Sequence, residues 1–243
     1  MSDPEFLSQL HSLLQSSHRS TLPDPESLIA HPKEYPRFPR ISLPETTPPS
    51  NTLFDSFTRR SSAKFPQEGS LTLDEISTLC SAVRTQPRSG TKRRTYPSGG
   101  GLLPIEFYIL AFNVSTLERK AYHYNAVLHA LEELWPLSDT ASREIFRQTT
   151  DTDSDFCAAH LILTARWRQS SAKYDNFAYI LSLLEAGHAA QNILLAGAAL
   201  SLAVRPLALF NFSYVSELLD LNPRLEQPSY SIAISSLPKG REI

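Results

Sequence analysis

Lys173-Tyr174 and the run Glu185-Ala-Gly-His-Ala-Ala-Gln-Asn192 are the part of this sequence that says most about its fold. They place a lysine and a phenol near the start of an apolar helix that also carries a glycine and several alanines. Lysine and tyrosine can both pass protons at an oxidation site. Exposed amides at a helix start, and a glycine, let a backbone approach a planar cofactor closely. The pattern is weak alone, and two further segments make it specific.

Those segments are Arg59-Arg-Ser-Ser-Ala-Lys-Phe65 and Tyr96-Pro-Ser-Gly-Gly-Gly101. Two arginines followed by a serine offer charge and directional donors for a phosphate group, although a solvated basic turn has the same composition. Pro97, Ser98 and Gly99 can turn the chain and leave amides and a hydroxyl exposed to the edge of a polar ring, although most turns of this kind are only turns.

In this order and at these separations, the three blocks resemble the nitroreductase superfamily, and within it the SagB-type peptide dehydrogenases, which oxidise thiazolines and oxazolines to thiazoles and oxazoles. The lead-in at 33–43, the helix start at 71–77 and Tyr122-His-Tyr124 fit that branch, so the likeness covers about residues 33 to 235. The resemblance implies an α+β fold with a central, mainly antiparallel sheet flanked by helices, in an intertwined homodimer.

The resemblance also implies a cofactor, FMN, held in two sites that both subunits build. Arg59 and Ser61, with Arg60, would hold its phosphate and ribityl chain, while Ala63 stands where the family often has another basic residue. The other residues implied at the cofactor are Pro97, Ser98 and Gly99 at the ring, the backbone of Glu185, Ala186 and Gly187 at its reactive edge, and Lys239 and Arg241 at the phosphate. For the last two, a frayed basic tail is the alternative.

Lys173 and Tyr174 match the pair that the resembling family uses in catalysis. Aromatising an azoline requires that one ring carbon lose a proton while a hydride leaves its neighbour for the flavin, so a nearby base lowers the barrier. Lysine and tyrosine ordinarily have pKa values of ~10.4 and ~10, so one must be depressed to act near neutrality. The alternative is a surface lysine beside a core tyrosine. The residues that follow, Asp175-Asn176-Phe177, depart from the family pattern.

Composition narrows the class of protein. A chain of 243 residues with 41% hydrophobic residues can bury one core. We expect an N-terminal helix and proline-rich strap over residues 1–50 and an FMN-binding domain over 51–243. A net charge of -2 gives no case for a nucleic-acid partner.

The positions of the cysteines and histidines give no pattern typical of a disulfide framework or a metal site. Cys80 and Cys157 are far apart and form no CxxC, which favours a reducing, cytoplasmic location. The seven histidines are dispersed, so no metal site is expected.

The start of the chain lacks a signal-peptide pattern, and polar residues such as Glu185 and His188 interrupt the apolar stretch at 180–204, so we expect no membrane span.

Periodicity and punctuation predict the elements in outline. A helix follows Asp3, and an extended strap covers residues 22–50, anchored by Tyr35, Phe38 and Ile41. Further helices are expected at 53–58, 72–83, 127–135 and 141–148, and one long or broken helix at 174–204. Strands are expected at 105–112, 120–124, 158–165 and 229–235, with a turn at 113–119 and a basic loop after the helix at 72–83.

These observations lead to one functional expectation and two alternatives. The first is an FMN-dependent dehydrogenase that converts azolines in a peptide to azoles, passes electrons to oxygen, and receives its substrate from a cyclodehydratase or carrier protein. The second is an NAD(P)H-dependent, nitroreductase-type oxidoreductase of small molecules. The third is a noncatalytic flavin-binding or scaffolding subunit.

Overall fold

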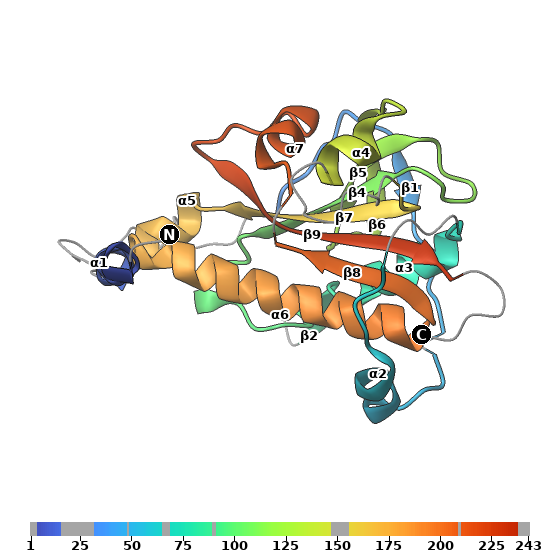
Figure 1. Ribbon diagram of the computed structural model, residues 1–243, viewed down its shortest axis with the longest axis horizontal. Coiled ribbons are helices and arrows are strands. Elements are labelled where there is room, and N and C mark those ends of the chain that lie inside the picture. The colour runs from blue at the N-terminus through green and yellow to red at the C-terminus, as the bar shows by residue number, and fades with distance from the viewer. Residues whose placement is uncertain are drawn as a thin grey trace.

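The computed structural model describes residues 4–15, 32–47, 49–64, 69–88, 91–146, 156–208 and 210–237. A central sheet carries the long helix α6 along one face and α4 and α7 across the other (Figure 1). Its seven strands are ordered β1-β6-β5-β4-β7-β9-β8, and every neighbouring pair is antiparallel. The α+β class and the antiparallel sheet predicted from the sequence are confirmed.

The strands of this sheet are β1 (Arg40–Ser42), β4 (Ile105–Ala111), β5 (Lys120–Asn125), β6 (Ala130–Pro136), β7 (Ala159–Arg166), β8 (Leu202–Leu207) and β9 (Glu226–Ser236). A separate hairpin consists of β2 (Thr85–Arg88) and β3 (Thr91–Arg94). The helices are α1 (Pro4–Gln15), α2 (Leu53–Arg59), α3 (Leu73–Ser81), α4 (Ala141–Phe146), α5 (Arg168–Tyr174), α6 (Phe177–Ala199) and α7 (Phe212–Leu218), with one 3₁₀ turn, η2 (Gly99–Gly101).

Strand β4 lies at the centre of the sheet and shows how the two faces are filled. All seven of its residues are buried. Because side chains alternate along a strand, Phe107 and Ile109 join the core under α6 while Tyr108 and Leu110 join the core under α4 and α7. The predicted turn at 113–119 connects β4 to β5 as expected.

Two helix starts were predicted at the right place. The Thr72 hydroxyl accepts the Glu75 N–H, and the Glu75 carboxylate accepts the Thr72 N–H, which forms the capping box expected for α3. Thr52 and Asp55 make the same arrangement at the start of α2. Reciprocal bonds of this kind satisfy helix-start amides that have no partner within the helix.

The long or broken helix predicted at 174–204 is broken near its start, and its predicted end is wrong. Asp175, with φ of 51°, separates α5 from α6, and Ser201, with φ of 55°, follows the end of α6. The chain then enters strand β8, which pairs along β9. Gly197 explains how α6 can pack so close to β8, since a β-carbon there would lie 2.5 Å from Cγ1 of Val204. Apolar residues of both elements fill one core, so hydropathy alone did not separate them.

The predicted helix at 127–135 is also wrong, because this segment forms β6. Leucine and glutamate favour helices, but propensity is a weak prior that tertiary pairing overrides. Strand β6 pairs with β1 on one side and β5 on the other. The expected basic loop after α3 is likewise replaced by the β2–β3 hairpin.

The described part of the strap follows the edge of the sheet and holds it through its aromatic residues. Tyr35 packs against His123, Phe38 against Trp135, and Ile41 against the core under α6, so the three predicted anchors are confirmed. Strand β1 adds the strap to the sheet. Residues 22–31 lie outside the described residues.

Helix α1 forms at the predicted place and contacts α6. Its apolar Phe6, Leu7 and Leu13 nevertheless remain more than half exposed. Within the described ranges, no helix combines the length and the hydropathy needed to cross a membrane.

Candidate active site

Lys173 and Tyr174 end helix α5, immediately before the chain turns into α6. Both side chains are half-buried. The Lys173 ammonium nitrogen lies 5.3 Å from the centroid of the Tyr174 ring, within the range of a cation–π contact. The two groups expected to handle a proton therefore lie side by side.

The chain at residues 98–103, which we call the glycine turn, lies against this pair. Gly100 has φ of 63°, and a β-carbon on it would lie 2.6 Å from the Tyr174 hydroxyl oxygen and 2.8 Å from Lys173 Nζ. Glycine is therefore required twice over, for its backbone angle and for the space it leaves. Ser98 and Gly99 are predicted site residues and Gly100 is not, although the run of three glycines was the signal in the sequence that could have indicated it.

Bonds within the glycine turn centre on Ser98. Its hydroxyl oxygen accepts the Leu103 N–H at 2.9 Å, and its carbonyl accepts the Gly101 N–H at 3.1 Å. Pro97, which precedes it, is exposed. On the other side, Gly99 packs over Leu181 of α6. The turn is thus seated between α5 and α6.

Glu185 lies on α6 one helical turn after Leu181, and only 3% of it is exposed. Burial raises the pKa of its carboxyl group to about 7, although hydrogen bonds from the Ser98 hydroxyl and the Gly99 N–H and the charge of Arg94 oppose the shift. A titratable group with such a pKa, bonded to the turn that contacts Lys173 and Tyr174, is typical of active sites.

The structure corrects the expected backbone role of Glu185, Ala186 and Gly187. They lie in the middle of α6 and not at a helix start, so their amides and carbonyls belong to the helical hydrogen-bond ladder. Ala186 is buried in the core, whereas Gly187 is exposed and a β-carbon there would meet nothing within 4 Å.

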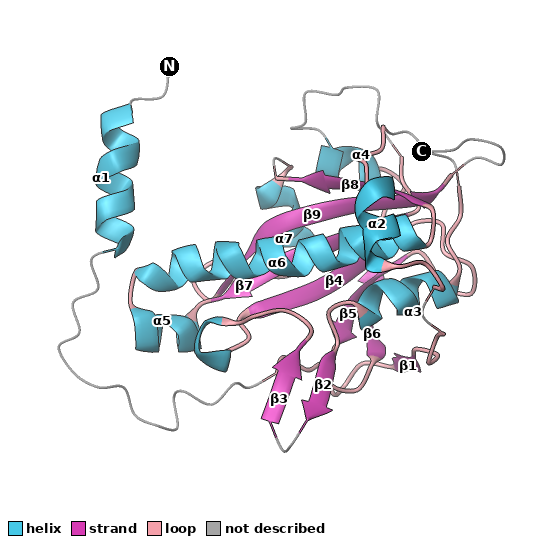
Figure 2. Ribbon diagram, turned by 90° about the horizontal axis from the view of Figure 1, so that it is seen from below, coloured by secondary structure: helices cyan, strands magenta, loops and turns pink. Residues whose placement is uncertain are grey.

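Arg59, Arg60 and Ser61 lie at the other end of α6. The Asn51 amide, just before α2, donates to the Ala199 carbonyl at 2.8 Å, and the Ala63 N–H donates to the Val204 carbonyl at 2.9 Å. Figure 2 shows α5 and α2 at opposite ends of α6. From Glu185 to Ala199 the helix rises about 20 Å. Within one chain, the arginines are therefore not brought to Lys173. Lys239 and Arg241 lie outside the described residues.

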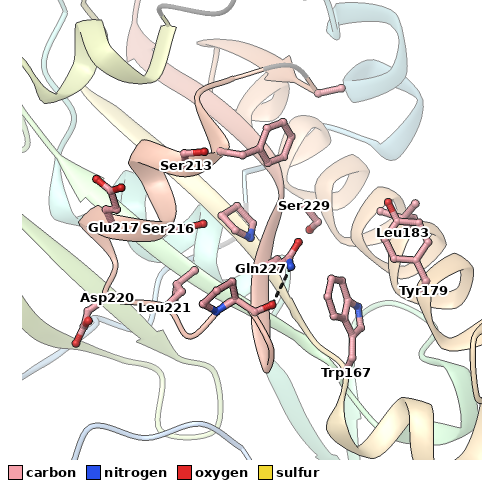
Figure 3. Close-up of a pocket in the computed structure, with 14 residues that line it drawn as sticks. Trp167, Tyr179, Leu183, Ser213, Ser216, Glu217, Asp220, Leu221, Gln227 and Ser229 are labelled. Atoms are coloured by element: carbon pink, nitrogen blue, oxygen red, sulfur yellow. Dashed lines mark hydrogen bonds between the residues drawn. The ribbon is translucent and has the colours of Figure 1, made fainter. Parts of the chain in front are cut away.

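A cavity of about 800 Å³ opens between the first half of α6 and helix α7 (Figure 3). Trp167, Tyr179 and Leu183 line one side, and Glu217 and Asp220 lie on the other. Residues two apart on a helix point about 200° apart, so Tyr179 and Leu183 face away from Leu181 and Glu185. With acidic groups and no lysine or arginine among its described lining residues, this cavity is a poor place for a phosphate.

A second polar cluster, which the sequence analysis missed, lies beneath the strap on the face of the sheet opposite α6. Lys33 Nζ bonds to Glu226 at 2.6 Å, and Glu226 also accepts the hydroxyl hydrogen of Tyr108. His123 bonds to Glu132 at 2.8 Å and lies 3.4 Å from Glu106. Burial raises the pKa of Glu106, but His123 and Arg166 outweigh it and hold the value at about 2. These groups satisfy one another, which is typical of a structural network.

No group of histidine, cysteine or acidic side chains in the described part of the chain could hold a metal ion. Both cysteines are buried thiols.

Comparison with known proteins fits this fold and arrangement. The nitroreductase family model matches residues 57–235, and this chain belongs to that family of oxidoreductases. It is 28% identical over 178 residues to the microcin B17-processing protein McbC of Escherichia coli, covering 69% of this chain and 63% of the relative. It is 28% identical over 204 residues to the trifolitoxin-processing protein TfxB of Rhizobium leguminosarum bv. trifolii, covering 77% and 54%. The chain thus spans between about half and two thirds of these curated relatives.

Solved structures share the fold. A chain of the E. coli microcin synthetase McbBCD complex, bound to truncated pro-MccB17, superposes with a TM-score of 0.66 at 23% identity, covering 98% of this chain and 95% of that one. A putative nitroreductase from Desulfovibrio desulfuricans, in complex with FMN, superposes with a TM-score of 0.50 at 15% identity, covering 79% and 92%.

Proposed function

We propose that this protein is an FMN-dependent dehydrogenase that oxidises azoline rings in a peptide to azoles. The observation that carries the proposal is the convergence of Lys173 and Tyr174 on Gly100 in a chain of the nitroreductase family. The names of two relatives, which process microcin B17 and trifolitoxin, support a peptide as the substrate.

The residues at the end of α2 fit the phosphate of FMN. Arg59 is exposed and Arg60 and Ser61 are half-buried, so two cations and a hydroxyl reach solvent together. Neither arginine has an ion-pair partner among the described residues. The Ala63 N–H fixes this segment to β8, so the arginines are presented from an ordered edge. When bound, FMN would supply the acceptor for a hydride, which these side chains cannot provide.

The distance between the arginines and Lys173 supports a homodimer that completes each site. Tyr179, Leu183 and Leu184 are exposed on the first half of α6, and Phe54 and Phe57 are exposed on α2. Exposed apolar patches of this kind mark interaction surfaces. A two-fold axis near the middle of α6 would lay α2 of one copy over the first half of α6 of the other. The partner subunit's Arg59 would then approach Lys173.

In the proposed reaction, two hydrogens leave neighbouring ring atoms of the azoline. One hydrogen leaves with the electrons of its C–H bond as a hydride, for which bound FMN would be the acceptor, and the other leaves as a proton, so that the electrons of its bond form the new double bond. Lys173 or Tyr174 takes the proton, since an amine or a phenolate beside the ring can accept it and pass it to solvent.

We also propose that the heterocycle is made by a partner protein and delivered to this chain. The McbBCD complex, whose structure holds a truncated precursor peptide, is a precedent in a chain of the same fold. The proposal predicts that the isolated chain binds FMN but acts only on peptides that already contain azolines.

The first experiment is the visible spectrum of the purified protein, before and after incubation with FMN. A flavin spectrum, with conversion of an azoline peptide to its azole, supports the proposal. Separate Lys173→Ala and Tyr174→Phe variants should lose turnover and keep the yellow colour. Bleaching by NAD(P)H without azoline turnover would instead indicate a small-molecule reductase, and a colourless protein that takes up no FMN would indicate a noncatalytic subunit.

A further inference from the structure

Glu185 is a buried acid whose carboxyl group holds the glycine turn from the side of α6. The Ser98 hydroxyl and the Gly99 N–H both donate hydrogen bonds to it. Leu181, one turn earlier on the helix, supports Gly99 from the same side, since a β-carbon on Gly99 would lie 3.3 Å from Leu181 Cδ1. The first residues of the turn are therefore fixed by one carboxyl group and one leucine.

The glycine turn needs such a support because one of its residues, Leu103, has a strained backbone conformation. Gly100 and Gly101 have φ of 63° and 69°, and Leu103, which is not a glycine, has φ of 51°. A branched residue in this region is uncommon and persists only where its surroundings hold it. Here the Leu103 N–H is held by the Ser98 hydroxyl oxygen, the same hydroxyl that donates to Glu185.

The far side of the turn touches the proposed catalytic pair. Gly100 leaves no room for a methyl group between its own backbone and the ends of Lys173 and Tyr174. A shift of the turn by a fraction of an ångström therefore changes where the amine and the phenol lie. Reacting groups tolerate little misplacement.

The environment of Glu185 leaves its charge without a close cation. One carboxyl oxygen, Oε1, is buried and has no hydrogen-bond partner among the described residues, and the same is true of the Tyr96 hydroxyl and Arg94 Nε. The groups that face this region are Arg94 on β3, Tyr96 before the turn and, across the turn, Lys173 and Tyr174 on α5. Arg94 acts on Glu185 only through its field.

We propose that Glu185 is a positioning residue that fixes the glycine turn against Lys173 and Tyr174, and that the turn loosens when this carboxylate takes up a proton. The part of this inference that concerns turnover rests on the proposed function, and the part that concerns the turn does not. The reason is the strength of the two bonds. A carboxylate accepts charge-assisted hydrogen bonds that are roughly twice as strong as those to a neutral acid.

The turn itself can be tested without flavin or substrate, by hydrogen–deuterium exchange over residues 96–104, corrected for the intrinsic rate at each pH. In the wild type we expect protection about fivefold higher at pH 8 than at pH 6, because local opening of the turn breaks the two charge-assisted bonds while the Glu185 carboxyl group stays buried on α6. Global unfolding has the opposite pH dependence, because it hydrates this carboxyl group. Glu185→Gln should show equal protection at the two pH values. Asp74→Asn, an exposed acid on α3, is the control and should behave as the wild type.

Kinetics test the positioning role. The kcat of the wild type on an azoline peptide should rise with pH through about 7, the pKa of Glu185. Glu185→Gln should remove this rise of kcat with pH, which we call the pH limb. It should also lower kcat at pH 8 about tenfold with little change in KM, because the geometry of the site is lost and substrate binding is not. Ser98→Ala should move the limb to higher pH, because the lost hydrogen bond stabilised the charged form.

The outcomes separate the two proposals. If exchange depends on pH only in proteins that carry Glu185 while no azoline is oxidised, the proposed function fails and the turn is still held as described. If Glu185→Gln keeps the pH dependence of exchange, or keeps the pH limb of kcat, the positioning role is overturned.

Discussion

Gly100 and Tyr174 are matched so closely that a single methyl group would collide with the phenol: a β-carbon on Gly100 would lie 2.6 Å from the Tyr174 hydroxyl oxygen. Gly101, the next residue, has nearly the same backbone angle, but a β-carbon on it would meet nothing within 4 Å. Substituting each glycine in turn therefore separates two effects. A side chain at either position strains the backbone, but only a side chain at Gly100 also displaces Lys173 and Tyr174.

We therefore predict different results for Gly100→Ala and Gly101→Ala. Both should lose about 1 kcal/mol of stability, because alanine is strained at positive φ. The added collision of Gly100→Ala is with the flexible ends of two side chains, so it should cost little further stability but lower azoline turnover at least tenfold. Urea denaturation and turnover of both variants check this. Equal turnover in the two variants would contradict the arrangement of the site.

The free energy of unfolding should depend on pH through the titration of Glu185. Its folded pKa, about 7, is raised above the ordinary value of 4.5, so its contribution is fully present below about pH 4.5 and is lost as the pH rises through 7. At about 1.36 kcal/mol per pKa unit, the loss is about 3 kcal/mol. Glu185→Gln should remove it, so that its free energy of unfolding falls less between pH 4.5 and 8. The same fall in both proteins would exclude Glu185 as the cause.

The bond between Lys33 and Glu226 should matter more than exposed pairs do. Only 22% of the Lys33 side chain and 7% of that of Glu226 are exposed. Lys33→Met leaves a buried carboxylate without its cation and should cost about 3 kcal/mol. Adding Glu226→Gln should recover part of that loss.

Arg119→Ala, which removes the exposed pair with Asp139, provides the comparison and should cost less than about 1 kcal/mol. Urea denaturation of these variants measures all of the differences. A loss for Lys33→Met no larger than that for Arg119→Ala would show that the strap does not depend on this bond.

Gly187 offers a test of the proposed dimer. It lies near the middle of α6, is exposed, and has open space where a side chain would be. Gly187→Trp should leave the fold intact but convert a dimer to monomers and lower FMN affinity, because the bulky ring blocks a close helix crossing. Light scattering and flavin titration measure both. Gly187→Ala at the same position should raise helix stability by up to about 1 kcal/mol. A tryptophan variant that stays dimeric would place the interface elsewhere.

The sequence predicts which segments contribute to the candidate site, but not how their side chains are arranged in space. Residue chemistry and a family likeness predict Lys173, Tyr174, Ser98 and Gly99, and the structure places Lys173 and Tyr174 against Gly100, the residue after Gly99. Nothing local in the sequence indicates that the Glu185 side chain turns inward to Ser98, since this contact joins residues almost ninety positions apart. Its pKa depends on burial, which is a property of the packed molecule.

The sequence by itself determined what is encoded locally: the capping boxes at Thr52 and Thr72, the central strand β4 with its unbroken apolar run, and the glycines that permit a strained turn. Each depends on neighbours within a few residues, so a pattern suffices. Tertiary structure alone decided that residues 130–136 form a strand between two partners and that residues 202–207 leave the helix for the sheet. Leucine, alanine and valine can fill either element, and hydrogen bonds to distant strands settle the choice.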